Sequence, residues 1–202
     1  MIESAKSIKF VSLKWKFMEA IDLGLSVKWA SCNIGASNPF ECGDFFAFGE
    51  TESKDIFSKV NYSANIMIGD FINEGGIKQL LPQNDVAQIR YGNKWRVPTR
   101  FEIEELIEKC SYDISKINGV YGTQVWSNNG NSVFIPNTGR KIDDKVLDER
   151  RLYYWLSTIR VDANQVNNSD VADGFGGDRG WIRCYFSYSV YVGRCIRPVM
   201  DY

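Results

Sequence analysis

Residues 181–187 run Trp-Ile-Arg-Cys-Tyr-Phe-Ser and alternate between two kinds of side chain. Ile182, Cys184 and Phe186 fall on one face of an extended chain. The opposite face carries Trp181, Arg183, Tyr185 and Ser187. A period of two over seven residues predicts a half-buried β-strand. We expect residues 190–199 to pair with it as the second strand of a hairpin, after a turn near Ser189 or Gly193.

A helix is predicted to begin at Thr99, directly after Trp95-Arg-Val-Pro98. Thr99 and Glu102 have the spacing of a capping box, in which the hydroxyl accepts a hydrogen bond from an orphan amide and the carboxylate bonds back. Apolar residues at helical spacing then form one stripe: Ile103, Leu106, Ile107 and Cys110. The acidic residues of the segment are expected to form a solvated face: Glu102, Glu104, Glu105 and Glu108.

Short β-like segments account for much of the remaining chain. Strands are predicted at residues 25–29, 43–50, 132–136 and 153–158. Residues 51–84 are expected to be irregular, the charged run 143–151 a solvated loop, and residues 160–180 a long polar loop. Few helices among many short antiparallel strands indicate the α+β class. The 202 residues fit one domain at 21–202, preceded by an arm or extra strand at 1–20.

The composition excludes several classes of function. The chain has no histidine, so Ser-His-Asp and Cys-His nucleophile pairs and histidine-ligated zinc are ruled out. Its 24 basic and 25 acidic side chains give a net charge of -1, which argues against a nucleic-acid partner bound through its phosphates. No run approaches the roughly 20 apolar residues of a membrane helix, so membrane insertion is not expected. Lysines interrupt residues 1–18, and no secretory signal is expected there.

The cysteines are five in number and lack the CxxC spacing of metal sites: Cys32, Cys42, Cys110, Cys184 and Cys195. We expect buried, reduced thiols. A bridge between Cys184 and Cys195, on strands expected to be adjacent, is the alternative.

No cofactor or metal site is predicted, with a calcium site as the alternative. Oxygen donors of the kind that bind calcium gather in one loop: Asp162, Asn164, Asn167, Asn168, Asp170, Asp173 and Asp178. They do not fit an EF-hand, and Asp and Asn are common in loops. Within the same region, Gly174 to Gly180 lacks the spacing of a phosphate-binding loop and is expected to be flexible.

The exposed side of the 181–187 strand and its neighbouring loop are predicted to bind a ligand. Tyr and Trp provide large contact areas at low entropy cost, and small polar residues adapt to a partner. The candidate ligand-binding residues are Thr158, Arg160, Asp170, Asp173, Asp178, Trp181, Arg183, Tyr185, Ser187, Tyr188 and Tyr191. The aromatic members would act as anchors, with Arg183, Asp170 and Asp178 selecting polar groups. The alternative is that several of the aromatics cover a second layer of the core.

Five ordered segments resemble the Fibrobacter succinogenes major paralogous domain family. They are DLGLSVKWASCNIGA (22–36), GDFFAFGET (43–51), WRVPT (95–99), YWLS (154–157) and GRCIRPV (193–199). The resemblance spans nearly the whole chain, from about Ile21 to Val199. It implies a C-type lectin-like fold, which the formylglycine-generating enzymes share, with Trp29, Trp95, Trp155 and residues 193–199 as scaffold.

In that fold, ligands meet the long loops and the strands near the C-terminus. Some phage and bacterial proteins on this scaffold have this surface diversified by retroelements, and residues 158–191 resemble such a region in their Tyr, Ser, Asn and Asp content. The resemblance therefore implies a non-enzymatic module that binds a cell-surface protein or glycan. Display on a cell surface or phage particle is the expected setting, although the export signal that family members often carry is not seen.

Two rival functions remain at this stage. One is a structural subunit of a surface or phage assembly. The other is a copper-dependent thiol oxidase similar to the formylglycine-generating enzymes, which would bind copper through Cys184 and Cys195, although these are not the closely spaced pair of that family. The Glu-Pro-Asn motif of sugar-binding lectins is absent, which argues against calcium-dependent sugar recognition.

Overall fold

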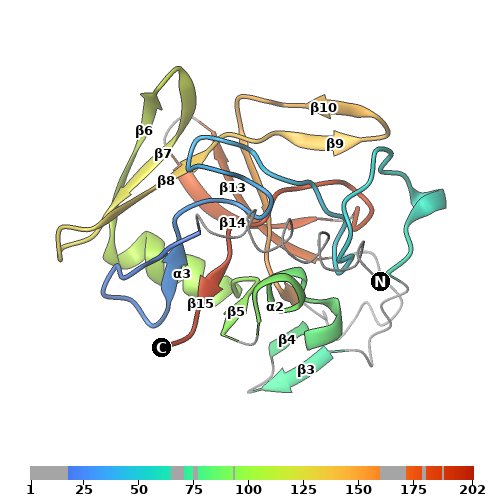
Figure 1. Cartoon of the computed structure of the whole chain (residues 1–202), viewed down its shortest axis with the longest axis horizontal. Helices are drawn as coiled ribbons and strands as arrows, with labels where there is room; N and C mark the ends of the chain where they lie inside the picture. Colours follow the sequence, from blue (N-terminus) through green and yellow to red (C-terminus); the bar gives the residue numbers. More distant parts are fainter. Residues whose placement is uncertain are drawn as a thin grey trace, which may run out of the picture.

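Short antiparallel strands make up most of the molecule (Figure 1). The computed structural model describes residues 18–64, 71–74, 77–92, 94–159, 172–178, 181–187 and 189–202. Every pair of named strands in these residues is antiparallel, and two α-helices lie among them. This composition is that of an α+β or mostly-β protein. Most of the expected arm, residues 1–17, lies outside the described residues.

The first sheet joins segments from both ends of the domain. Its strand order is β1 (Ala20–Ile21), β2 (Lys28–Ala30), β15 (Val199–Met200) and β5 (Trp95–Arg96). Val199 lies opposite Trp29 on one side and opposite Arg96 on the other. Trp29 and Val199 are completely buried, so this sheet closes the domain around its largest core side chain.

A buried arginine fastens this sheet to the rest of the core. Arg197 is fully buried and donates to the side-chain oxygen of Asn33 at 2.8 Å and to the carbonyls of Ala30 and Phe134, both at 3.0 Å. The Asn33 amide in turn donates to the Tyr154 hydroxyl at 3.0 Å. Burial lowers the pKa of Arg197, and these acceptors replace the water that the guanidinium has lost.

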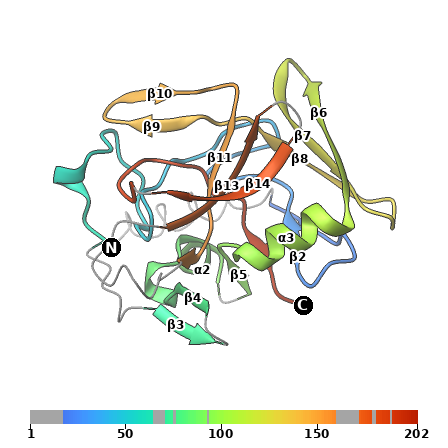
Figure 2. The ribbon, with the colours of Figure 1, turned by 180° about the vertical axis from the view of Figure 1, so that it is seen from behind.

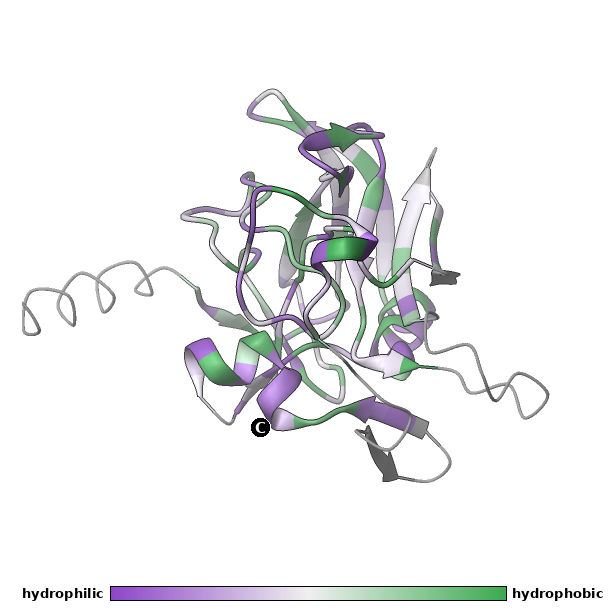
Figure 3. Cartoon of the chain, turned by 90° about the vertical axis from the view of Figure 1, so that its right-hand side faces the viewer, coloured by the Kyte–Doolittle hydropathy of each residue, from purple (hydrophilic) through white to green (hydrophobic). Residues whose placement is uncertain are grey.

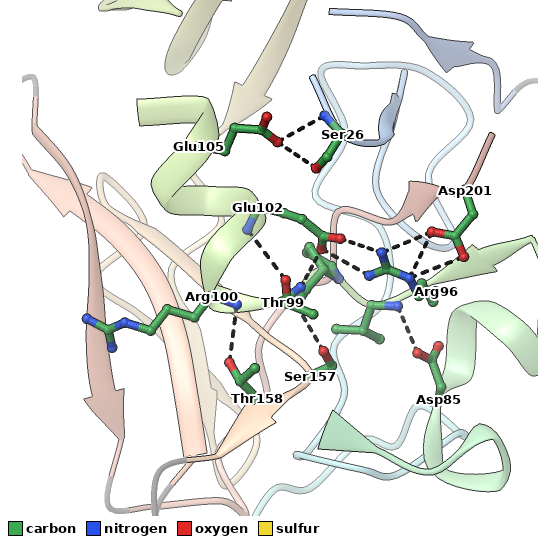
Figure 4. Close-up of polar contacts among 12 residues, drawn as sticks. Ser26, Asp85, Arg96, Thr99, Arg100, Glu102, Glu105, Ser157, Thr158 and Asp201 are labelled. Carbon is green, nitrogen blue, oxygen red and sulfur yellow. Dashed lines mark hydrogen bonds and ion pairs between the residues drawn. The ribbon is translucent and has the colours of Figure 1, made fainter. Parts of the chain in front are cut away.

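The two α-helices have well-defined N-caps. Asp85 precedes α2 (Val86–Tyr91) and accepts from the amides of Ala87 and Gln88. Thr99 precedes α3 (Arg100–Lys109), and its reciprocal bonds with Glu102 confirm the predicted capping box (Figure 4). The helix therefore starts where the sequence predicted.

The acidic residues of α3 do not all face water, contrary to expectation. Glu102 is 7% exposed and pairs with Arg96, which also reaches Asp201 (Figure 4). Glu105 accepts from the amide and hydroxyl of Ser26 at 3.0 and 2.6 Å. These two carboxylates bind distant segments, which periodicity within the helix could not indicate, whereas Glu104 and Glu108 are exposed.

Residues 111–147 form an antiparallel meander and a hairpin. The meander consists of β6 (Ser111–Ile117), β7 (Val120–Trp126) and β8 (Ser132–Pro136), and the hairpin of β9 (Arg140–Ile142) and β10 (Lys145–Leu147). The prediction at 132–136 is confirmed. The solvated loop expected at 143–151 is wrong in part, since β10 lies within it and pairs with β9.

Residues 51–84 are more ordered than expected. They contain the 3-10 turns η1 (Lys59–Asn61) and η2 (Pro82–Asn84) and the strands β3 (Phe71–Glu74) and β4 (Ile77–Leu80). β4 also pairs with β12 (Thr158–Ile159), which overlaps the end of the strand predicted at 153–158. Residues 43–50 contribute only an isolated bridge from Phe46 to Arg194.

The last sheet has the order β11 (Leu152–Trp155), β13 (Ala172–Asp178) and β14 (Trp181–Ser187). The strand predicted at 181–187 is confirmed, but its predicted partner is wrong. It pairs with residues 172–178, which were expected to be flexible loop, and residues 190–198 carry only isolated bridges. Figures 1 and 2 show this sheet in the middle of the molecule, with the β9–β10 hairpin above it and α3 below.

Two clusters of buried apolar side chains form the core. The first joins Trp29, the apolar stripe of α3 and the inner face of the β11–β13–β14 sheet. The second gathers around Trp155 and includes Phe46 and Phe48. Hydrophobic and hydrophilic positions alternate along several of the strands in Figure 3, as expected when only one sheet face packs on a core. The opposite face of the β11–β13–β14 sheet packs on the second cluster through Trp155, and the rest of that face is the surface to consider for function.

Candidate functional site

The outer face of the β11–β13–β14 sheet has large side chains on its edge strands and glycine at two successive outward positions of its central strand. Gly176 of β13 lies between Tyr153 and Arg183 in the strand register. One step along, Gly174 lies between Trp155 and Tyr185. Residues that face each other in an antiparallel sheet share a face, so the two glycines leave a trough between aromatic and basic side chains.

These glycines are required by the neighbouring atoms rather than by an unusual backbone conformation. A Cβ at Gly176 would collide with the carbonyl of Leu152 and would come 2.8 Å from the ring of Tyr185. A Cβ at Gly174 would lie 2.8 Å from both the Tyr154 carbonyl and the Arg194 guanidinium. Glycine therefore lets Tyr185 lie across the central strand, which explains why a Gly-rich segment forms a strand here.

Arg194 fills one end of the trough. Its guanidinium carbon lies 4.1 Å from the centre of the Trp155 ring and 5.1 Å from that of Tyr185, and Nη1 donates to the Tyr185 hydroxyl at 2.8 Å. The arginine is 4% exposed, and burial lowers its pKa. Stacking on these rings compensates for part of the water that the cation has lost.

The other end of the trough is open and forms a hollow of about 600 Å³, which we call the sheet hollow. This volume falls within the roughly 300–1,000 Å³ that is usual for small-molecule sites. The sheet hollow is lined by Arg151, Leu152, Tyr153, Gly176, Gly177, Trp181, Ile182, Arg183 and Tyr185. All of these residues belong to the β11–β13–β14 sheet or directly precede it, so one rigid element positions the whole lining.

Aromatic rings and arginines determine the chemistry of the sheet hollow. Trp181 is 72% exposed, Arg183 is exposed, and Tyr153 packs edge-on against Tyr185 with ring centres 6.1 Å apart. Burial raises the pKa of Tyr185 to about 12, so its hydroxyl stays protonated at neutral pH. No carboxylate side chain is found in the lining among the described residues. The arrangement can present flat apolar surface together with charged hydrogen-bond donors.

The structure brings together some of the predicted ligand-binding residues. Trp181, Arg183 and Tyr185 line the sheet hollow, although Tyr185 is half-buried and not fully exposed as expected. Asp178 lies on β13 and Ser187 on β14, but the structure does not describe where their side chains lie. Tyr191 is half-buried in the segment that follows β14. Arg160, Asp170 and Tyr188 lie outside the described residues.

Thr158 and Asp173 do not belong to the exposed surface, and this part of the prediction is wrong. Each is 2% exposed, and the Thr158 hydroxyl donates to Asp173 at 3.0 Å and accepts from the Arg100 amide at 3.3 Å. An oxygen of Asp173 lies 3.5 Å from the Arg100 guanidinium. Asp173 occupies the inner face of β13, so it connects the sheet to α3 and does not select a ligand.

The calcium alternative loses one of its oxygen donors for the same reason. Asp173 is committed to Thr158 and Arg100 in the interior. The donors Asp162, Asn164, Asn167, Asn168 and Asp170 lie outside the described residues. Within the described part of the chain, no three acidic or cysteine side chains are grouped as metal ligands.

All five cysteines are free thiols, so the alternative of a Cys184–Cys195 bridge is not realised. Cys195 is fully buried, and burial raises its pKa well above the usual value. Burial also raises the pKa of Cys184 to about 12. Shared copper binding would require the two thiols to meet, whereas β13 and β11 lie between Cys184 and Cys195.

Three residues of the trough were missed by sequence reasoning. Arg151 was assigned to a solvated loop, Tyr153 to an unspecified strand face and Arg194 to the scaffold. The alternation of Leu152 and Tyr154 with Tyr153 is a signal that Tyr153 faces outward. The two glycines spaced by two at Gly174 and Gly176 are a second signal, because such spacing clears one face of a strand.

Searches against protein-family models, curated proteins and solved structures found no match to this chain. No helix among the described residues has the length and apolar character needed to cross a membrane.

Proposed function

We propose that this protein is a non-enzymatic binding module on a C-type lectin-like scaffold, with the sheet hollow as its binding site and a cell-surface protein or glycan as its partner. The observation that carries the proposal is the open end of the trough, where exposed Trp181 and Arg183 lie beside the rings of Tyr153 and Tyr185. Specific sites typically combine mainly apolar surface with a few placed polar groups, as the sheet hollow does.

The exposure of Trp181 supports this proposal. A tryptophan that is 72% exposed contributes little to the core, whereas tryptophan is among the most enriched residues at the centres of interfaces. Its strand is held by pairing with β13 from Trp181 to Ser187, so the ring is presented from rigid backbone. Rigid anchors of this kind bind with a smaller entropy cost than anchors on loops.

The test is binding to arrays of glycans and of extracellular proteins by the wild-type chain and by Trp181→Ala and Arg183→Ala. We expect each variant to lose at least about tenfold in affinity for the retained partner, as is usual for anchor residues. Tyr185→Ala is unsuitable because it would also remove the hydrogen bond to buried Arg194.

Trp126→Ala is the matched control, because Trp126 is 44% exposed on β7 and does not line the sheet hollow. It should bind as the wild type does. Equal binding by folded Trp181→Ala and Arg183→Ala would show that the sheet hollow is not the binding site.

We further propose that this face varies between copies of the gene, as the sequence resemblance implies. Deep sequencing of the locus across a population tests this, and β14 contains its own control. Substitutions should concentrate at the outward positions 181, 183 and 187 and avoid the alternating positions 182, 184 and 186. An invariant locus, or substitutions spread equally over both faces, would contradict diversification.

A further inference from the structure

Strand β6 forms an open edge of the β6–β7–β8 sheet, at the margin of the molecule (Figures 1 and 2). The other edge, at β8, is closed by side chains: Arg197 donates to the Phe134 carbonyl at 3.0 Å, and Tyr154 donates to the Pro136 carbonyl at 2.7 Å. Within the described part of the chain, β6 pairs with β7 alone, and no other segment bonds to its backbone. An open strand edge is a template for pairing with another chain.

The register shows which backbone groups of β6 face away from β7. The Tyr121 carbonyl of β7 accepts from the Asn137 amide at 2.8 Å, so odd positions of β7 face β8 and even positions face β6. Gly122 lies opposite Ser115, so odd positions of β6 bond to β7. The even positions therefore direct their amides and carbonyls to the open edge: Tyr112, Ile114 and Lys116.

Apolar surface is exposed beside these backbone groups. Ile114 is 42% exposed, and Tyr121, on the same face of the sheet, is 46% exposed. A lysine on an edge strand usually keeps other strands away, but Lys116 is held over the Tyr121 ring, 4.9 Å from its centre. Two strands further along the same row, Ile135 is completely buried. A strand added at β6 would therefore extend a face that is already buried at β8.

We propose that β6 pairs with β6 of a second copy of this chain, antiparallel about a two-fold axis at Ile114. In this register position 112 lies opposite position 116, and 113 lies opposite 115. Each outward-facing residue then exchanges both of its backbone hydrogen bonds with the residue opposite. Asp113 faces Ser115 of the second copy and Lys116 faces Tyr112, so no like charges stand opposite each other.

Charge and strand length select this register over its neighbours. An axis at Asp113 would place two carboxylates directly opposite each other, which is unfavourable. An axis at Ser115 would place Tyr112 opposite Asn118, which lies beyond the end of β6 in the turn with φ 51. Only the axis at Ile114 uses all three outward-facing residues. A two-fold pair also closes on itself, so it produces a dimer and not a fibre.

Pairing has a competitor within β6 itself. The Asp113 carboxylate accepts from the Ile114 amide at 2.7 Å, and this bond must be exchanged for the carbonyl of the second copy. A single strand pair also buries less than a standard interface of about 1,600 Å². We therefore expect a dissociation constant of roughly 10–100 μM. The dimer does not depend on the sheet hollow being a binding site; where both hold, two hollows per particle raise the avidity for a surface-displayed partner.

The test is sedimentation equilibrium of the full chain from about 1 μM to about 1 mM, a range that brackets the expected constant. Ile114→Lys places like charges on the two-fold axis and should weaken the dimer at least about tenfold. Ile89→Lys makes the same change at a position 53% exposed on α2 and should dimerise as the wild type does. A wild type that stays monomeric throughout, or an equal constant for the wild type and Ile114→Lys, would overturn the inference.

Cross-linking tests the register. Ile114→Cys places a thiol opposite its own copy on the two-fold axis, where mild oxidation should join two chains. In the matched control, Ser115→Cys, the two thiols sit two residues out of register with Cα atoms roughly 7–8 Å apart, beyond the usual reach of a disulfide. The wild type, oxidised in parallel, gives the background from its five native thiols. Absence of covalent dimer in Ile114→Cys, or equal cross-linking of the two variants, would overturn the interface.

Discussion

Tyr185 shows how one side chain connects the core to the candidate site. Burial raises its pKa from 10.0 to about 12, and its hydroxyl accepts a hydrogen bond from Arg194. Because the folded pKa is the higher one, the corresponding stability is fully present below pH 10 and is lost as the pH rises from about 10 to 12.

Replacement of this phenol provides a direct measurement. We expect Tyr185→Phe to remove one late-titrating phenol from the absorbance titration at 295 nm and to make stability fall less steeply above pH 10. In denaturant, the absorbance difference between the two proteins should appear around the ordinary tyrosine pKa of about 10. A folded-state difference with its midpoint at about pH 10 would show that Tyr185 is solvated.

Arg197 is a second residue whose role depends entirely on distant partners. Arg197→Met would leave three buried oxygens, on Asn33, Ala30 and Phe134, without their donor. We expect a loss of about 3 kcal/mol in the free energy of unfolding, measured by urea denaturation. Arg150→Met, at an exposed position, should change it by less than about 0.5 kcal/mol. Similar values for the two variants would contradict this account.

Strand β13 depends on glycine because of the side chain that crosses it. Gly176→Ala should destabilise the protein by more than about 2 kcal/mol, since the added methyl group meets the Leu152 carbonyl and the Tyr185 ring. Gly119→Ala is a useful comparison, because Gly119 has φ +84 and nothing within 4 Å of the added atom. It should show only the backbone cost of about 1 kcal/mol. The comparison fails if Gly176→Ala proves the milder change in thermal denaturation.

The elements also show which predictions periodicity supports. The helix at 100–109 and the strand at 181–187 were predicted because capping, stripe and alternation are local properties. The partner of that strand was wrong because pairing joins residues distant in sequence. β13 was expected to be loop because its glycines have low strand propensity, and the contacts that require them come from β11 and β14.

The fold buries three of its five cysteines and leaves Cys42 and Cys184 half-buried. Burial raises the pKa of Cys184 to about 12 and that of Cys195 well above the usual value. At pH 8 the thiolate fraction is therefore much smaller than in the unfolded chain, and labelling with a disulfide reagent should be slow until denaturant releases all five thiols. Cys184→Ser should leave the native rate unchanged. Rapid native labelling that this substitution removes would indicate a reactive thiol and revive the oxidase alternative.

The candidate site was predicted in part. Trp181 and Arg183 were recognised because alternation places them opposite the apolar face of their own strand. Thr158 and Asp173 were misplaced because a polar side chain in a polar stretch is expected to be exposed, and only the packing of α3 on the sheet gives them buried partners. Arg194 could not be recognised, since its role comes from stacking on rings of two other strands.

Local sequence by itself determined the start of α3, the two faces of β14 and the exclusion of histidine chemistry, because each depends on residue type and short-range spacing. The tertiary structure alone decided the rest. It paired β13 with β14, buried Arg197 and Asp173 against distant hydrogen-bond partners, and opened the sheet hollow beside Tyr185. These features depend on which remote segments meet, and that is set by the burial of the whole core and not by any single stretch of chain.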